Sequence, residues 1–180
     1  MRKKFLALLA LLALLYFSGC GYTTGSMLPP GKDTIHVENF KNKIAVASEL
    51  SNRRVYYGYK PGMESTITTA VINEFVFDGN LKIANENTAH YILKGELVDF
   101  QRQPLEYNSE ENVTQYRLRV VTNLELYDRE TGKLLWKEQG WAGQALYRTS
   151  GKYEQTDSQT VDEAIQDLAR RVVDRTIEDW

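Results

Sequence analysis

Apolar positions recur along the chain with two different periods, and the period assigns each segment to a strand or a helix. Between residues 114 and 127 polar and apolar side chains alternate, as in a strand with one buried face. One face of this segment would carry Tyr116, Leu118, Val120, Thr122, Leu124 and Leu126. The other would carry Arg117, Arg119, Asn123 and Glu125. Similar patterns predict strands over residues 34–40, 89–100 and 134–147.

Two segments show the longer repeat of an amphipathic helix. The first opens after Pro61-Gly62, and its apolar side chains recur every four residues, at Met63, Ile67, Val71 and Phe75. Gly79 suits the left-handed cap at its end. The second is expected from about Thr160 to Trp180, with Thr160 and Glu163 forming a capping box. Its apolar stripe is Val161, Ile165, Leu168, Val172 and either Thr176 or Ile177.

The turns between these segments complete a fold prediction. Residues 128–133 are typical of a hairpin turn, with Gly132 at a position that needs positive φ. Gly140 and Gly143 indicate a bulge in the fourth strand. The order β-α-β-β-β-α predicts an α+β two-layer sandwich, with an about four-stranded, mostly antiparallel sheet and two helices on one face. Arg117 and Arg119 would lie on the open face, and we expect Trp136 in the core.

The N-terminal segment has the composition of an export signal. Three basic residues at 2–4 precede an apolar run over residues 5–17, which is too short to span a membrane. The only cysteine of the chain, Cys20, follows the small residues Ser18 and Gly19. An odd cysteine in an exported protein needs an explanation. We interpret the stretch as a bacterial lipobox, although Phe17 stands where that motif usually has an aliphatic residue.

Acylation of Cys20 would turn this thiol into a lipid anchor, in which fatty chains such as palmitate hold the protein to the membrane. Residues 1–19 would be a cleaved signal peptide, residues 20–32 a lipidated flexible tether rich in Gly, Thr, Ser and Pro, and residues 33–180 a single domain. Gly21 stands where an aspartate would retain a Gram-negative lipoprotein at the inner membrane. The expected location is therefore the periplasmic side of the outer membrane.

Charge and motifs argue against nucleic-acid binding and catalysis. Without the three basic residues of the signal, 19 basic and 24 acidic side chains remain, which is unlike a strongly basic nucleic-acid binder. His36 and His90 have no ligand at metal-binding spacing, so we predict no metal, no cofactor and no catalytic residue. We interpret Glu110 and Glu111 as solvated carboxylates of a polar loop. A glycosidase activity stays an alternative, because the two catalytic carboxylates of such an enzyme can be distant in sequence.

Several stretches in order resemble one known family. They are "CGY", "IHVENFKN" (35–42), "GMESTITTAVINEFVFDGNLKI" (62–83), "AHYILKGEL" (89–97), "YRLRVVTNLELYDRETGKLLW" (116–136) and "AIQDLARRVVDRTIEDW" (164–180). Together they are similar to LptE, the lipopolysaccharide-assembly lipoprotein. The resemblance implies a partner, the outer-membrane β-barrel LptD, which the protein would plug from the periplasmic side. It also implies binding of lipopolysaccharide on its way to the cell surface.

The predicted topology suggests where an anionic lipid would bind. Loops 101–113 and 148–159 should lie at one end of the sheet, and loop 41–60 joins them if the first strand pairs parallel to the second. Both helices would begin there, with their positive dipole ends. The candidate lipopolysaccharide-binding residues form a cationic rim of Lys41, Lys43, Arg53, Arg54, Lys60, Arg102, Arg148 and Lys152. Carboxylates in the same loops leave a solvated mixed-charge surface as the alternative: Glu106, Glu110, Glu111 and Glu154.

Tyrosines next to this rim suggest a contact with the partner. Tyr56, Tyr57 and Tyr59 follow two arginines, and both residue types are enriched at interfaces. These side chains could equally pack on the domain's own sheet. The competing function from another class is a non-enzymatic pilotin or scaffold lipoprotein of a different envelope or secretion machine.

Overall fold

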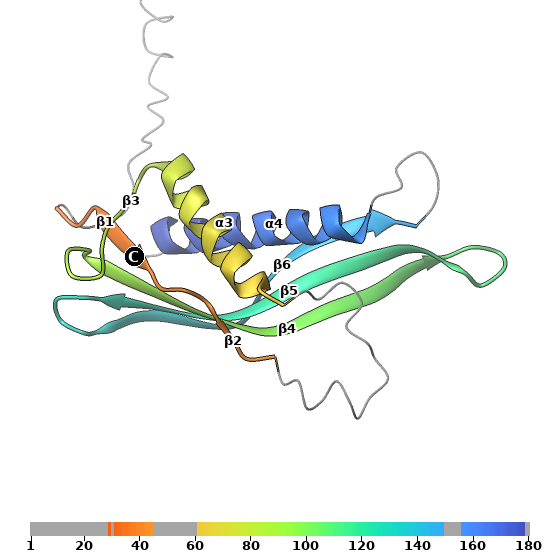
Figure 1. The fold of residues 1–180 in the computed structure, drawn as a ribbon, viewed down its shortest axis with the longest axis horizontal. Coiled ribbons are helices and arrows are strands. Elements are labelled where there is room, and N and C mark those ends of the chain that lie inside the picture. Colours follow the sequence, from red (N-terminus) through yellow and green to blue (C-terminus); the bar gives the residue numbers. More distant parts are fainter. Residues whose placement is uncertain (1–28, 30, 45–60, 150–155, 179–180) are drawn as a thin grey trace, which may run out of the picture.

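The computed structural model describes residues 29, 31–44, 61–149 and 156–178 of the 180-residue chain. These residues form six strands and two helices (Figure 1). In chain order they are β1 (Thr34–Val37), β2 (Lys41–Asn42), α3 (Met63–Asp78), β3 (Lys82–Ile83), β4 (Tyr91–Tyr107), β5 (Val113–Asp128), β6 (Leu134–Arg148) and α4 (Asp157–Glu178). The predicted succession of elements is confirmed, and β2 and β3 are short strands that the sequence pattern did not indicate.

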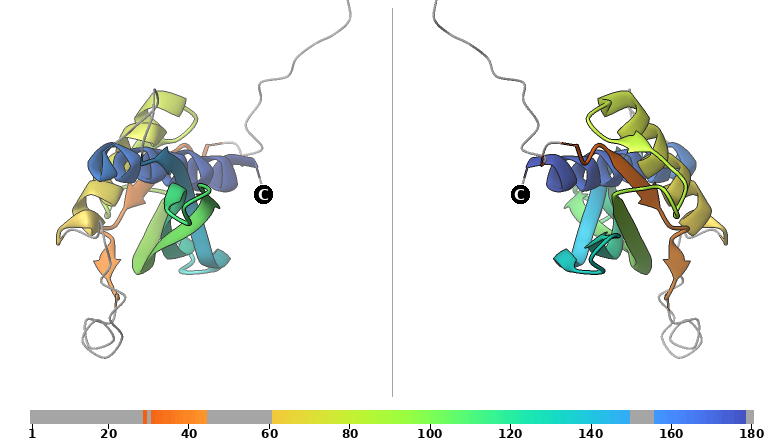
Figure 2. Two further views of the ribbon diagram at one scale, coloured as in Figure 1. Left: turned by 90° about the vertical axis from the view of Figure 1, so that its right-hand side faces the viewer. Right: turned by 90° about the vertical axis from the view of Figure 1, so that its left-hand side faces the viewer.

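One sheet contains all six described strands, in the order β3-β1-β4-β5-β6, with β2 also pairing with β4. β1 runs parallel to β4, so α3 lies in a crossover connection. This is the condition under which the predicted topology brings loop 41–60 beside loops 101–113 and 148–159. β4, β5 and β6 form an antiparallel meander. Figure 2 shows both helices on the same face of the sheet, which confirms the two-layer α+β architecture.

The second predicted strand is longer than its apolar pattern. β4 continues to Tyr107, so the predicted loop 101–113 is reduced to residues 108–112. The additional part contains Pro104 and pairs with β5 through two register shifts, one between Pro104 and Glu106 and one between Glu106 and Tyr107. It extends beyond the helices (Figure 1), and residues 103–107 are exposed. A strand segment with solvent on both faces needs no apolar alternation, which is why the pattern ended too early.

The core lies between the helices and the sheet. The apolar stripes predicted from the sequence form the helical side of this core, because all four stripe residues of α3 and all six of α4 are buried. They pack over the predicted inner face of β5, and Trp136 of β6 is buried there as well. Thr176 and Ile177 are both buried, so the two alternatives for the end of the α4 stripe are both realised.

α4 begins one turn earlier than predicted. The capping box is made by Thr156 and Gln159: the Gln159 amide donates to Thr156 Oγ1 at 3.3 Å, and the Thr156 amide donates to Gln159 Oε1 at 3.2 Å. The predicted box of Thr160 and Glu163 is wrong. Thr160 is buried inside the helix, where its hydroxyl donates to the Thr156 carbonyl at 3.1 Å. The two candidate pairs have the same spacing, so spacing alone could not choose between them.

Three of the four glycines assigned special roles adopt the expected conformations. Gly79 caps α3 with a φ of 79°, and Gly132 has a φ of 68° in the β5–β6 turn. Gly140 has a φ of 69° at a register shift between β5 and β6, which confirms a bulge there. Gly143 lies outside this shift and faces α4 instead. Its role is close packing, so the prediction of a bulge at Gly143 is wrong.

α4 also protects the outer edge of β6. The Gln144 amide donates to Asp167 Oδ2 at 3.0 Å, and Arg171 Nη1 donates to the Ala142 carbonyl at 2.7 Å. Both backbone groups belong to the last strand of the sheet, where unpaired groups would otherwise invite pairing with another chain. Two helix side chains therefore take the place of a further strand.

Ion pairs fix the point at which the chain enters the domain. Lys32 pairs with Asp128, which also accepts hydrogen bonds from the Thr131 amide at 2.9 Å and hydroxyl at 3.0 Å. The hydrogen bond from Lys32, followed by that from the Thr131 amide, lowers the pKa of Asp128 from 3.8 to about 2. Next to it, Lys82 Nζ lies 3.0 Å from Asp33 Oδ2 and ties β3 to the start of β1.

We expect the interactions of the Asp128 carboxylate with Lys32 and Thr131 to make the free energy of unfolding depend on pH in the acid range. Its folded pKa is depressed, so its contribution is complete above about pH 4 and is lost as the pH falls toward 2. Asp128→Asn should cost about 1–2 kcal/mol at pH 7, with the partial exposure of Lys32 limiting the loss. Urea unfolding at pH 7, 4 and 2.5 measures this. The variant should lose less stability than wild type between pH 4 and 2.5, and parallel curves would contradict the assignment.

Candidate functional site

Half of the predicted cationic rim lies within the described residues. Lys41, Lys43, Arg102 and Arg148 are placed by the structure. The remaining predicted functional residues lie outside the described part of the chain: Cys20, Arg53, Arg54, Tyr56, Tyr57, Tyr59, Lys60 and Lys152.

Lys41 and Lys43 lie together on β2 and directly after it. Lys41 stands beside Glu96 in the parallel register with β4, and the Lys43 amide donates to the Leu97 carbonyl at 2.8 Å. The preceding residue, Phe40, donates its amide to Thr68 Oγ1 of α3 at 2.9 Å. Both lysine side chains are exposed. The backbone around them is therefore held to the sheet and to α3 while their ammonium groups face solvent.

Arg102 is part of an aromatic cluster that the sequence did not reveal. Its guanidinium carbon lies 3.9 Å from the ring centroid of Tyr116 and 5.2 Å from that of Tyr147. The two rings stack with centroids 5.4 Å apart, because the residues are paired across β5 and β6. The sequence pattern placed Tyr116 on the inner face of its strand. The pairing of Tyr116 with Tyr147 would have revealed the cluster, but it depends on the register between the two strands. The stacked rings hold the cation against the inner face of the sheet.

The four described cations are not gathered into one rim. Arg102 pairs with Leu118 on the inner face, whereas Arg148 pairs with Gln115, whose side chain points to the opposite face. Lys41 is level with Glu96 of β4 and Arg148 with Glu106, ten residues farther along, or roughly 33 Å at the usual rise per residue. The described residues thus offer a lysine pair near the middle of the sheet and two separate arginines toward the β4–β5 hairpin.

Several other cations of the domain already have a carboxylate partner. Lys94 lies 3.0 Å from Glu38, Lys137 lies 2.7 Å from Glu125, and Arg175 lies 2.8 Å from Glu138. The hydrogen bonds raise the pKa of Lys94 and of Lys137 and lower the pKa of Glu125. Among the described residues, by contrast, no carboxylate pairs with Lys41, Lys43 or Arg148. These three cations are available to an external anion.

The open face of the sheet carries mixed polar groups, as predicted. Arg119 Nη1 donates to Gln101 Oε1 at 3.0 Å, and Arg117 is half-buried opposite Gln103. Leu146 of β6 shares this face and is 47% exposed. The face is therefore neither a second core nor a uniformly charged surface.

The two histidines are engaged within the fold. His36 Nδ1 lies 3.1 Å from the Ala84 carbonyl oxygen, and His90 Nδ1 lies 2.7 Å from Thr34 Oγ1. Within the described residues no group of three His, Cys, Asp or Glu side chains could hold a metal ion. No helix of the described part is long and apolar enough to cross a membrane.

Fold and surface together define a binding or assembly module: a two-layer α+β domain with one bare sheet face and a few unpaired cations. A family model described as lipopolysaccharide-assembly, LptE, matches residues 33–177. The chain therefore belongs to the LptE family, a family of assembly proteins rather than enzymes.

Two solved structures with TM-scores above 0.5 share the fold at low sequence identity, and a third is similar at a lower score. A hypothetical protein, CT253, from Chlamydia trachomatis is 10% identical with a TM-score of 0.53, over 81% of this chain and 95% of that one. Protein XCC0632 from Xanthomonas campestris is 12% identical with a TM-score of 0.52, over 81% and 86%. A rare lipoprotein B from Shewanella oneidensis is 15% identical with a TM-score of 0.42, over 78% and 89%. No curated protein matches the sequence.

Proposed function

We propose that this protein is an outer-membrane lipoprotein that partners an LptD-like β-barrel as its plug and assembly factor and binds lipopolysaccharide during transport. The observation that carries the proposal is the LptE family match, which spans residues 33–177. The leader that ends at the single Cys20 supports anchoring through a lipid on the periplasmic side.

The shape of the domain supports a protein partner. Both helices cover one face of the sheet (Figures 1 and 2). The other face presents Arg117, Arg119 and the exposed Leu146. Interfaces of transient and permanent complexes combine apolar contacts with arginine in this way. The tyrosines Tyr56, Tyr57 and Tyr59 remain candidate contact residues of the same partner.

The unpaired cations support binding of a phosphorylated lipid. A phosphate that approaches Lys41 and Lys43 displaces no carboxylate of the described residues, so the charge-assisted hydrogen bonds break no ion pair within that part of the chain. The exposed Arg148 could bind a second phosphate group away from the lysines. The guanidinium of Arg102 is already oriented by the ring of Tyr116. Arg53, Arg54, Lys60 and Lys152 remain part of the proposed binding set.

The partnership is tested by affinity purification from detergent-solubilised outer membrane, with tagged protein that retains Cys20. We expect a large β-barrel to co-purify in about equal amount. A Cys20→Ser variant should appear in the periplasmic fraction instead of the membrane, because the lipid anchor is lost. Recovery of secretion-machine components without a barrel would overturn the proposal in favour of the pilotin function.

Lipopolysaccharide binding is tested by charge reversal on β2. We expect Lys41→Glu with Lys43→Glu to weaken lipopolysaccharide binding about tenfold, the loss of one or two charge-assisted hydrogen bonds. Each single variant should have a smaller effect. Lys133→Glu is the matched control, because Lys133 is an exposed lysine in the β5–β6 turn, at the end of the sheet opposite the β4–β5 hairpin. Equal binding by the double variant and wild type, measured with purified lipopolysaccharide at one salt concentration, would exclude this pair from the site.

A further inference from the structure

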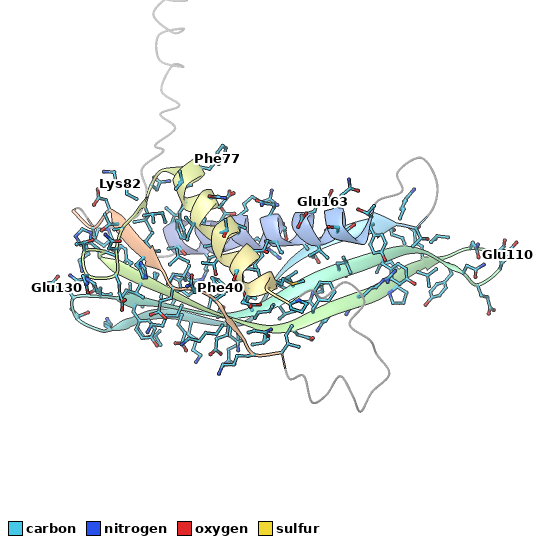
Figure 3. All side chains as sticks on the ribbon, viewed as in Figure 1. Phe40, Phe77, Lys82, Glu110, Glu130 and Glu163 are labelled. Carbon is cyan, nitrogen blue, oxygen red and sulfur yellow. The ribbon has the colours of Figure 1, made fainter. Side chains whose placement is uncertain are left out.

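Val76 and Phe77, in the last turn of α3, form the most exposed apolar pair among the described residues. Phe77 is 87% exposed and Val76 is 67% exposed. Figure 3 shows Phe77 at the end of α3, pointing away from the sheet. A single exposed apolar side chain is ordinary, but two adjacent large ones at one helix end form a contact point.

This turn lies beside the point where the chain enters the domain. α3 ends at Asp78, and after three intervening residues β3 pairs with the first residues of β1, Thr34 with Lys82 and Ile35 with Ile83. The Lys82–Asp33 ion pair joins the same two segments. Figure 1 shows the end of α3, β3 and the start of β1 toward the end of the molecule opposite the β4–β5 hairpin. The entry point and the apolar pair therefore share one end of the molecule.

The length of the preceding segment relates this end to the bilayer. Twelve residues, 21–32, separate Cys20 from Asp33, and an extended chain of that length spans at most about 40 Å. The Lys32–Asp128 and Lys82–Asp33 pairs fix where that segment joins the domain. If Cys20 carries the lipid, as the proposed function requires, this end of the domain is held near the membrane surface and the hairpin end lies farther away.

The charges around the pair favour apolar contact over electrostatic attraction. Asp78 accepts hydrogen bonds from the Asn80 amide at 3.1 Å and side chain at 2.9 Å, and Asp33 is paired with Lys82. An aromatic and an aliphatic side chain next to such groups suit the boundary between headgroups and acyl chains.

We propose that Val76 and Phe77 contact the phospholipid surface to which the protein is anchored. This inference rests on the proposed function, because the anchor at Cys20 brings the pair to the bilayer. The contact gives the tethered domain a fixed end against the membrane, so that α3 adds a second attachment beside the lipid.

Site-directed fluorescence tests this with the lipidated full-length chain in phosphatidylethanolamine–phosphatidylglycerol vesicles. Because acylation consumes the thiol of Cys20, Phe77→Cys supplies the only reactive thiol for an environment-sensitive dye. Leu146→Cys, on the open face of the sheet, is the matched control. We expect the dye at position 77 to show a blue-shifted emission and at least threefold stronger quenching by spin-labelled lipids than the dye at position 146.

Vesicle flotation separates the possible failures. Flotation with equal, water-like emission at both positions would overturn this inference and leave the anchor intact. Shielding of position 77 only after addition of the barrel partner would also overturn it, because the occupant would then be protein. A chain that does not float with the vesicles would show that the anchor is missing, and both proposals would fall.

Discussion

Gly143→Val is expected to destabilise the domain by about 3 kcal/mol or more, because β6 and α4 approach each other there without room for a side chain. A β-carbon at Gly143 would overlap the Ala164 carbonyl oxygen and the Leu168 amide nitrogen. Both are backbone atoms of α4, so no change of rotamer relieves the overlap. The helix would have to move off the strand, which would also strain the hydrogen bonds that Asp167 and Arg171 make to β6.

The neighbouring residue provides the control for this substitution. Ala142 is half-buried, and its side chain points to the open face, so Ala142→Val should change the free energy of unfolding by less than about 1 kcal/mol. Gly143→Ala should lie between the two valine variants. Urea unfolding of the three variants measures the order. If Gly143→Val were as stable as Ala142→Val, the close packing of α4 on β6 would be incorrect.

The parts of the fold that the sequence predicted correctly are those in which burial imposes a period. Met63 to Phe75 and Val161 to Ile177 repeat at helical spacing because each stripe faces the core. The alternation over residues 114–127 places the polar and apolar faces of β5 correctly for the same reason. Periodicity therefore identified the elements wherever one face is buried and the other is solvated.

The features that the sequence missed have no such constraint. The outer part of β4 has solvent on both faces, so its length is fixed by pairing with β5 and not by apolar alternation. That extension moves the hairpin away from Lys41 and Lys43 and separates these lysines from Arg148. The aromatic support of Arg102 likewise arises from pairing of Tyr116 with Tyr147, which depends on a register that no local pattern contains.

A double-mutant cycle between Phe40 and Gly95 is expected to show compensation larger than 1 kcal/mol. Phe40 is buried, and its ring occupies the space above Gly95 of β4 where a β-carbon would stand. Phe40→Ala should cost about 3–4 kcal/mol by leaving a cavity, and Gly95→Val about 1–3 kcal/mol by colliding with the ring. In the double variant the valine methyl groups enter the space that the ring vacates. Its loss of stability should therefore be clearly smaller than the sum of the two single losses.

Phe40→Ala combined with Gly143→Val serves as the uncoupled control. The two changes act on different contacts, the Phe40 ring over Gly95 of β4 and the approach of Gly143 to Ala164 and Leu168 of α4, so their losses should add within about 0.5 kcal/mol. Additivity of the Phe40–Gly95 pair as well would show that the ring does not fill this space.

The same packing bears on function: Phe40 directly precedes Lys41, and its amide donates a hydrogen bond to Thr68 of α3. If Lys41 and Lys43 bind lipopolysaccharide as proposed, Gly95→Val in the Phe40→Ala background should restore binding together with stability, because the position of both lysines depends on the pairing of β2 with β4.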